Sequence, residues 1–230
     1  MSLYRIMLVL VGLALLAGVN VATAAETDPE FAFKLGEYNR VNPKQSELFT
    51  RASRVMSGDL YDANNKAVGD IDDVLIAREG NIYGVQTSLD RIIPGGPSLT
   101  LSFSVMDMNA VTGGYRMNQT AKDLEAAYPN LFASIETASG PDSGVLSVRS
   151  LINADVKAEN GVKIGKVEDV IFESDSSRVH SLMVRVNYKT IRGKSVAVPI
   201  DAPKYTEGSY GRPDVILTNV EADTLLEFAY

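Results

Sequence analysis

The chain has few residues that can do covalent or metal chemistry. It contains no cysteine and one histidine, His180, which excludes thiolate nucleophiles, cysteine-ligated metals and any site that needs two imidazoles. A serine–histidine triad on a G-x-S-x-G turn is also absent from the sequence. We therefore expect no metal, no cofactor and no enzymatic activity. His180 is predicted to be a half-buried residue near the start of a strand, on the same face as Leu182 and Val184.

Three neighbouring carboxylates, Asp70, Asp72 and Asp73, form the most obvious candidate cation cluster. Upstream, Asp62 begins a stretch that resembles a calcium loop, but Lys66 stands where a fifth-position ligand is required. Strand alternation also sends neighbouring carboxylates to opposite faces. These aspartates are therefore predicted to have structural roles, in turns and in hydrogen bonds to the backbone.

Two loops carry side chains that suit the binding of a partner. Tyr205, Tyr210 and Arg212 lie in a segment interrupted by glycine and proline, and tyrosine and arginine are enriched in interface hot spots. In the first half of the chain, Ile92 and Ile93 precede a Pro-Gly-Gly-Pro turn. The alternative for both loops is that they fold back over their own domains.

The charge balance limits the class of partner. Lys and Arg number 22 against 29 Asp and Glu, a formal net charge of −7 over 230 residues. A nucleic-acid backbone would be repelled by this excess. The expected partner is a protein or a component of the cell envelope, and association with the membrane surface is left open.

The N-terminus has the layout of a secretory signal peptide. Arg5 precedes an unbroken apolar run from Ile6 to Val19, and small residues follow it. The A-x-A-like site at 22–24 predicts cleavage after Ala24, with Ala25 as the alternative, so the mature protein is expected to be periplasmic or secreted. An uncleaved anchor that keeps the body on the same extracytoplasmic side is the second option.

The mature chain contains a duplication. Shifting the sequence by 96 positions places residues 54–76 on residues 150–172, and five of the 23 pairs are identical, against about one or two by chance. The apolar positions of the two stretches also agree. The predicted organisation is a signal peptide (1–24), a polar lead (25–53), a first domain (54–132), a linker (133–148) and a second domain (149–230).

Both units have the pattern of short strands that end in a helix. Asn160-Gly161 predicts a hairpin turn, and Asn64-Asn65 occupies the same place in the first unit. Thr120 and Asp123 form a capping box for a helix that Pro129 is expected to end. The second unit closes on a similar run, which Asn219 can cap. So many short strands must sandwich or close to hide their edges.

Three stretches together resemble the PRC-barrel family, the small β-barrel named from the photosynthetic reaction-centre H subunit: residues 68–76 (VGDIDDVLI), 164–172 (IGKVEDVIF) and 196–202 (VAVPIDA). The resemblance implies an all-β fold of two tandem small PRC-barrel-like barrels, each ending in a short helix. It also implies an interaction module that is not a catalyst. The residues that carry the pattern are expected to be structural: Gly69, Asp73, Gly165, Asp169 and Pro199.

These observations predict an exported, non-enzymatic interaction or scaffold protein that binds protein or envelope partners through the loops and edges of its barrels. A carboxylate-dependent hydrolase that acts in the groove between the units is one alternative, since acid–base pairs need neither cysteine nor histidine. A membrane-tethered assembly factor that keeps its N-terminal anchor is the other.

Overall fold

A computed structural model describes residues 27–95, 98–133, 144–173, 175, 177–189, 191–218, 220 and 222–230. Side chains are not described at residues 128–133, 191, 192 and 210. The predicted signal peptide with its cleavage site, Asn219 and most of the predicted linker lie outside these residues. No helix in the described part of the chain is both long and apolar enough to cross a membrane.

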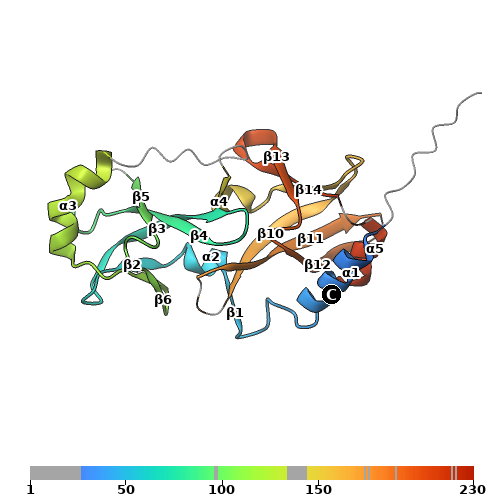
Figure 1. Cartoon of the computed structure of the whole chain (residues 1–230), viewed down its shortest axis with the longest axis horizontal. Coiled ribbons are helices and arrows are strands. Elements are labelled where there is room, and N and C mark those ends of the chain that lie inside the picture. The colour runs from blue at the N-terminus through green and yellow to red at the C-terminus, as the bar shows by residue number, and fades with distance from the viewer. Residues whose placement is uncertain are drawn as a thin grey trace, which may run out of the picture.

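Two seven-stranded sheets are the main secondary structure of the described chain, so the predicted all-β class is confirmed (Figure 1). The first sheet has the order β5-β4-β3-β2-β7-β6. The seventh strand, β8, pairs with the last three residues of β3. Its strands are β2 (Asp59–Tyr61), β3 (Ala67–Ala77), β4 (Ile82–Ser88), β5 (Ser98–Ser102), β6 (Asn109–Val111), β7 (Gly114–Arg116) and β8 (Val145–Ser147).

The second sheet repeats this topology strand for strand. Its order is β12-β11-β10-β9-β14-β13, and β1 pairs with the last three residues of β10. In each sheet one parallel pair, β2 with β7 or β9 with β14, joins otherwise antiparallel strands. The strands are β1 (Phe49–Arg51), β9 (Asp155–Ala158), β10 (Lys163–Glu173), β11 (Val179–Tyr188), β12 (Ile191–Pro199), β13 (Lys204–Glu207) and β14 (Pro213–Leu217).

The turns form where the sequence predicts them. Asn65 at φ 61° lies between β2 and β3, and Gly161 at φ 80° lies between β9 and β10, so each turn uses a residue that tolerates the left-handed region. Each hairpin leads into an eleven-residue strand, β3 or β10. Within the described residues, hydrogen bonds do not join the two ends of either sheet.

A short helix follows each sheet, as predicted: α3 (Ala121–Ala133) and α5 (Ala222–Glu227). The capping box of α3 is present, because Asp123 Oδ2 accepts from the backbone N–H of Thr120 at 3.1 Å and Thr120 Oγ1 accepts from that of Asp123 at 3.3 Å. The prediction that Pro129 ends this helix is wrong. A proline removes only one backbone donor, and α3 continues beyond it to Ala133.

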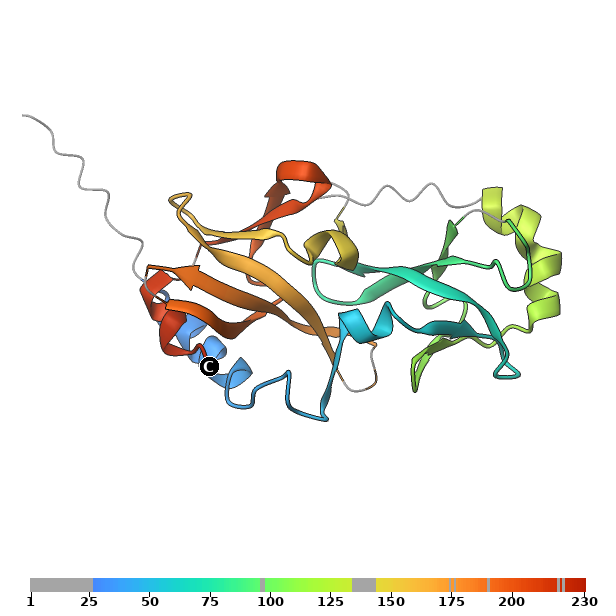
Figure 2. The ribbon, with the colours of Figure 1, turned by 180° about the vertical axis from the view of Figure 1, so that it is seen from behind.

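The strand that enters each repeat pairs with the sheet of the other repeat. β1 leads into α2 (Ala52–Val55) and pairs with β10, while β8 leads into α4 (Val148–Leu151) and pairs with β3. Figure 2 shows α2 and α4 together between the two sheets. The predicted linker over 133–148 therefore needs correction, because it contains β8 and the start of α4.

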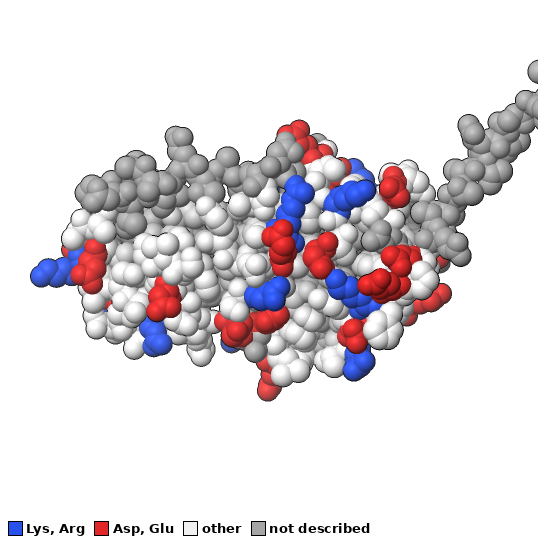
Figure 3. Space-filling view, in the orientation of Figure 1, with Lys and Arg blue, Asp and Glu red and all other residues white. Residues whose placement is uncertain are grey.

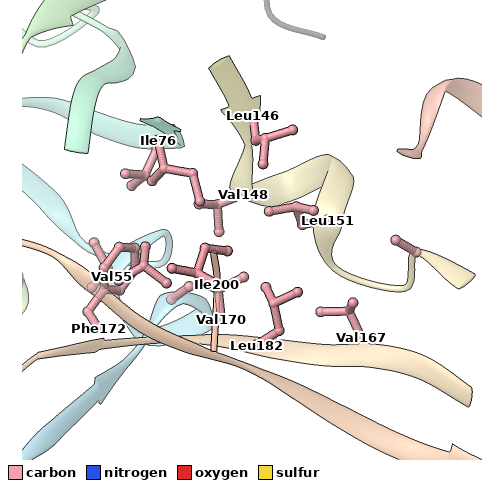
Figure 4. Close-up of a cluster of buried hydrophobic side chains, with 14 of the residues drawn as sticks. Val55, Ile76, Leu146, Val148, Leu151, Val167, Val170, Phe172, Leu182 and Ile200 are labelled. Carbon is pink, nitrogen blue, oxygen red and sulfur yellow. The ribbon is translucent and has the colours of Figure 1, made fainter. Parts of the chain in front are cut away.

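The two sheets share one continuous apolar core, so the two predicted tandem barrels are not separate in their interiors. The exchanged helices cause this merging, since Val55 of α2 and Leu151 of α4 are buried at the junction. Figure 4 shows them beside apolar side chains of both repeats, namely Ile76, Leu146, Val148, Val167, Val170, Phe172, Leu182 and Ile200.

The predicted polar lead is folded against the second sheet. It contains α1 (Pro29–Tyr38), which begins at the N-cap Asp28, buries Phe31 and Leu35, and contacts β12. Beyond α1 the chain crosses the sheet to β1 (Figure 1). We call residues 27–51 the N-terminal strap.

The strap holds His180 between two aromatic rings. The Tyr38 ring is stacked at 4.5 Å from the imidazole and the Phe49 ring at 4.3 Å. His180 is half-buried, as predicted. The prediction that His180 shares a strand face with Leu182 is wrong. The register between β10 and β11 shifts at His180, which turns the imidazole to the opposite face. There it lies with Tyr38 and Phe49, the rings that cover Met183.

Candidate binding site at the junction between the two sheets

The repeated aspartates Asp73 and Asp169 tie the exchanged segments to the opposite sheets. Asp169 of β10 accepts from Arg51 Nε at 2.7 Å, from Ser53 Oγ at 2.7 Å and from the Ser53 backbone N–H at 3.1 Å. These contacts satisfy the first turn of α2, so the predicted structural role of Asp169 is a tie between repeats.

Asp73 makes the equivalent contacts with α4. Its carboxylate accepts from the Ser147 hydroxyl, from the Arg149 backbone N–H at 2.9 Å and from the Val74 backbone N–H at 2.8 Å. Burial raises the pKa of the Asp73 carboxyl above its usual range, and these hydrogen bonds offset only part of that rise. The other two members of the predicted carboxylate cluster point elsewhere: Asp70 pairs with Arg91, and Asp72 accepts from Ser98.

A cavity of about 600 Å³ opens beside Asp73, between the first sheet and a hairpin of the second. One wall consists of Asp73 and Gln86 of the first sheet with Ser147 and Ser150 of the exchanged segment. The hairpin between β13 and β14 forms the other wall, with Glu207 and Arg212 among its lining residues. The cavity therefore depends on both repeats.

Figure 3 shows acidic and basic side chains interspersed over one face of the molecule, so charge on that face is mixed and not of a single sign.

A second cavity of about 590 Å³ occupies the equivalent place at the other junction. It is lined by Thr50, Arg54 and Val55 of the exchanged segment and by residues 110–114 of the β6–β7 hairpin. Asp169 is not among its lining residues and has no exposed surface. The two cavities thus differ in their access to the repeated carboxylate.

The predicted binding residues lie in different environments, and of those whose side chains are described only Arg212 lines the cavity. Arg212 is exposed and lines the first cavity. Tyr205 is a core residue, which corrects its prediction as a contact: it is 5% exposed, and its hydroxyl donates to the Ile200 carbonyl at 2.6 Å. The Tyr210 side chain lies outside the described residues. Ile92 and Ile93 pack half-buried against the core, as the alternative for their loop expects.

The predicted structural residues lie on strands that build the junction. A Cβ on Gly69 would overlap the Ser88 carbonyl, and a Cβ on Gly165 would overlap that of Arg185, so the repeated glycines allow close backbone approach. Pro199 ends β12, opposite Ser181. Gly69 and Gly165 lie four residues before the two aspartates.

Sequence comparison of the repeats did not identify the residues that complete the site. The donors to Asp169 are Arg51 and Ser53, and the donors at the same positions of the other junction are Ser147 and Arg149. Neither pair is identical between repeats. The shared signal is only positional, since each donor pair begins 22 residues before its homologous aspartate but contacts the aspartate of the other repeat.

The sequence pattern of the PRC-barrel domain matches residues 143–223. This range contains the second sheet from β9 to β14, together with β8 and α4, which dock on the first sheet. Small β-barrel modules of this family often occur in interaction contexts. No curated protein sequence matches the chain.

Proposed function

We propose that this chain is an exported, non-enzymatic interaction protein built from two PRC-barrel-like domains, of which the first lies within residues 54–132. The two sheets have the same strand order, which supports assigning the first repeat to the same type of domain as the second. The partner is a protein or an envelope component that contacts the junction. The observation that carries this proposal is the cavity of about 600 Å³ whose β13–β14 wall presents the exposed Arg212.

The use of the repeated carboxylates favours binding over catalysis. Asp73 and Asp169 each accept at least three hydrogen bonds from the chain itself, mostly from the exchanged segments. The chain itself orients both oxygens of each carboxylate, which disfavours a nucleophilic attack on a substrate. Duplication has therefore repeated a structural tie, and the hairpins at the junction, which differ in sequence between the two repeats, are the parts free to select a partner.

Affinity capture from the envelope fraction tests the proposal. We expect Arg212→Glu to change which proteins are captured, because the reversed charge faces the cavity. Lys204→Glu is the matched control, since Lys204 is exposed on the same hairpin and does not line the cavity. If wild type and both variants capture the same proteins, the junction is not the binding surface.

The location of the protein is tested separately, by N-terminal sequencing of the exported protein. A sequence that begins at Ala25 supports cleavage after Ala24, and one that begins at Glu26 supports the alternative cleavage after Ala25. A sequence that begins at Met1 or Ser2 would favour the tethered assembly factor. Recovery of the protein only from the cytoplasm would contradict both.

A carboxylate-dependent hydrolase is the second candidate, because Asp73 and Glu207 line the same cavity and the pKa of Asp73 is raised by burial. A proton donor with a raised pKa is one half of an acid–base pair. Turnover of a glycoside or ester by the wild type that Glu207→Gln abolishes, with an unchanged circular dichroism spectrum, would favour the hydrolase. Equal rates for the two proteins would leave the interaction role.

A further inference from the structure

The two junctions differ at one position that faces the repeated aspartate. Arg51 of β1 pairs with Ile171 of β10, and in the same register Ser147 of β8 pairs with Leu75 of β3. Ser147 therefore stands where the other junction has an arginine. The structure thus contains an internal comparison of one aspartate with a guanidinium partner and one without.

The arginine changes what the aspartate receives. At the second sheet, Asp169 has an ion pair with Arg51, whose Nε lies 2.7 Å from Oδ2. At the first sheet, Asp73 receives neutral donors, from Ser147 and from two backbone N–H groups. Arg149 is near, but its Nε donates to the carbonyl of Asp72 at 2.8 Å. Burial without an ion-pair partner agrees with the raised pKa of Asp73.

At the first sheet, a cavity lies beside the aspartate where the second sheet has an arginine. Asp73 and Ser147 line the cavity of about 600 Å³, whereas Asp169 lines no part of the equivalent cavity. Gln86, which pairs with Asp73, adds an amide to the wall, and the buried Met183 holds this position beside Asp169. A polar recess is therefore open at the junction where, among the described residues, no side-chain cation forms an ion pair with the aspartate.

We propose that this recess binds the guanidinium group of an arginine side chain from a protein partner, which takes the place that Arg51 fills beside Asp169. The inference rests on the proposed interaction function and names the chemistry of its partner. Asp73 is the anion, the Gln86 amide oxygen accepts a further N–H, and the planar fork of the guanidinium suits two acceptors at once. Arg212 at the cavity wall disfavours a partner segment with further basic residues beside that arginine.

A peptide titration of the full chain tests the proposal. The probe is Ac-Ala-Arg-Ala-NH₂, followed by isothermal titration calorimetry and by amide chemical shifts at Gln86 and Ser150. The control peptide has citrulline in place of arginine, which keeps the shape and removes the charge. We expect at least tenfold weaker binding of the citrulline peptide. Free L-arginine is the third arm, and tighter binding of the free amino acid than of the peptide would contradict a protein partner.

Matched variants keep the test independent of folding defects. Ser147→Arg gives this junction the arginine of the other one, and we expect it to abolish peptide binding. The melting temperature should change little, because the new ion pair with Asp73 offsets the loss of the N-cap bond that Ser147 Oγ accepts from the Ser150 N–H. Arg51→Ser removes the natural arginine from the other junction and is expected to leave peptide affinity at the Asp73 cavity unchanged. Asp73→Asn is expected to lose binding as well, with the circular dichroism spectrum as its control.

The outcomes separate this inference from the proposed function. Equal affinity for the arginine and citrulline peptides, or unchanged binding by Ser147→Arg, would overturn the arginine ligand. If Arg212→Glu still changes the set of captured proteins in that case, the interaction role stands and only its chemistry is wrong. If the arginine peptide binds no better than the citrulline peptide and Arg212→Glu captures the same proteins as the wild type, the junction is not a binding surface.

Discussion

Arg51 and Asp169 form an ion pair between the two repeats, with Nε 2.7 Å from Oδ2 across a separation of 118 residues in sequence. The carboxylate has no exposed surface, while the arginine is 45% exposed. The pair lies where β1, the strand that enters the first repeat, meets the sheet of the second repeat. The repeated aspartate is thus a tie between the halves and not a feature of either half alone.

Asp169→Asn should weaken this tie. The variant keeps one acceptor oxygen but puts an amide among donors from Arg51 and Ser53, so we expect the free energy of unfolding to fall by about 1–3 kcal/mol. Urea unfolding measures the loss. Asp223→Asn, at an exposed ion pair with Lys189, is the control and should leave the transition nearly unchanged. Equal effects of the two substitutions would show that the buried contact has no special weight.

Leu151→Ala should destabilise both repeats together. The side chain is fully buried in the shared core, and its truncation is expected to cost about 2–5 kcal/mol. Hydrogen exchange should show faster exchange in β3 and in β10 alike, because α4 contacts both strands. Faster exchange in only one sheet would mean that the repeats unfold independently.

The repeated glycines should not tolerate a side chain. Gly69→Ala and Gly165→Ala each place a Cβ against a backbone carbonyl of the neighbouring strand, and we expect each to lose about 1–3 kcal/mol. Gly36→Ala is the matched control, because its Cβ would lie 3.5 Å from Phe228, an ordinary contact, within a helix that alanine favours. Thermal melts of the three variants rank them, and a destabilised control would contradict this account.

The strap should make stability depend on acid pH through Glu168. Partial burial raises the pKa of this carboxyl, but hydrogen bonds from Lys44, Arg185 and Ser195 outweigh it and lower the pKa to about 2. A lowered pKa gives stability that is complete above the unfolded value of 4.5 and is lost as the pH falls towards 2. Urea midpoints between pH 5 and pH 2.5 should fall less steeply for Glu168→Gln. Parallel curves would contradict the prediction.

His180 should titrate below the ordinary range of histidine. Burial lowers its pKa, so the neutral ring is favoured in the fold and stability declines as the pH falls below about 6.5. Because the chain has one histidine, a single imidazole Cε1 proton reports the midpoint by NMR. His180→Phe should keep the stack with Tyr38 and Phe49 and remove this pH dependence. A midpoint at or above 6.5 would show that the strap does not bury the ring.

Strand type and the repeated aspartates could be predicted from the sequence, but not the exchange that joins the halves. A shift of 96 residues aligns Asp73 with Asp169, and Asn160-Gly161 marks a hairpin. The same alignment holds whether β1 pairs with β3 or with β10, because periodicity defines the strand and not its neighbour. The shared core follows from that neighbour and so was missed as well.

The candidate site shows the limit of residue type as a guide. Tyr205 and Arg212 are both of kinds enriched at interfaces, yet the tyrosine hydroxyl donates to the Ile200 carbonyl, five residues earlier, and only the arginine reaches the cavity. Ser147 is a residue typical of an N-cap, and it caps α4, but its type does not indicate the contact with Asp73. Its importance comes from the register that places it opposite Leu75, where Arg51 stands at the other junction.

The exchanged strands also fix the order of events when the chain is made. Arg51 leaves the ribosome 118 residues before Asp169, an interval of roughly 6–24 seconds at ordinary rates of synthesis. During that time β1 and α2 have no strand to dock on, whereas β8 and α4, which cover the first sheet, are made before Asp169. The docking of β1 and α2 is therefore completed only after β10 has been made, which leaves a period in which these amino-terminal segments are open to a chaperone.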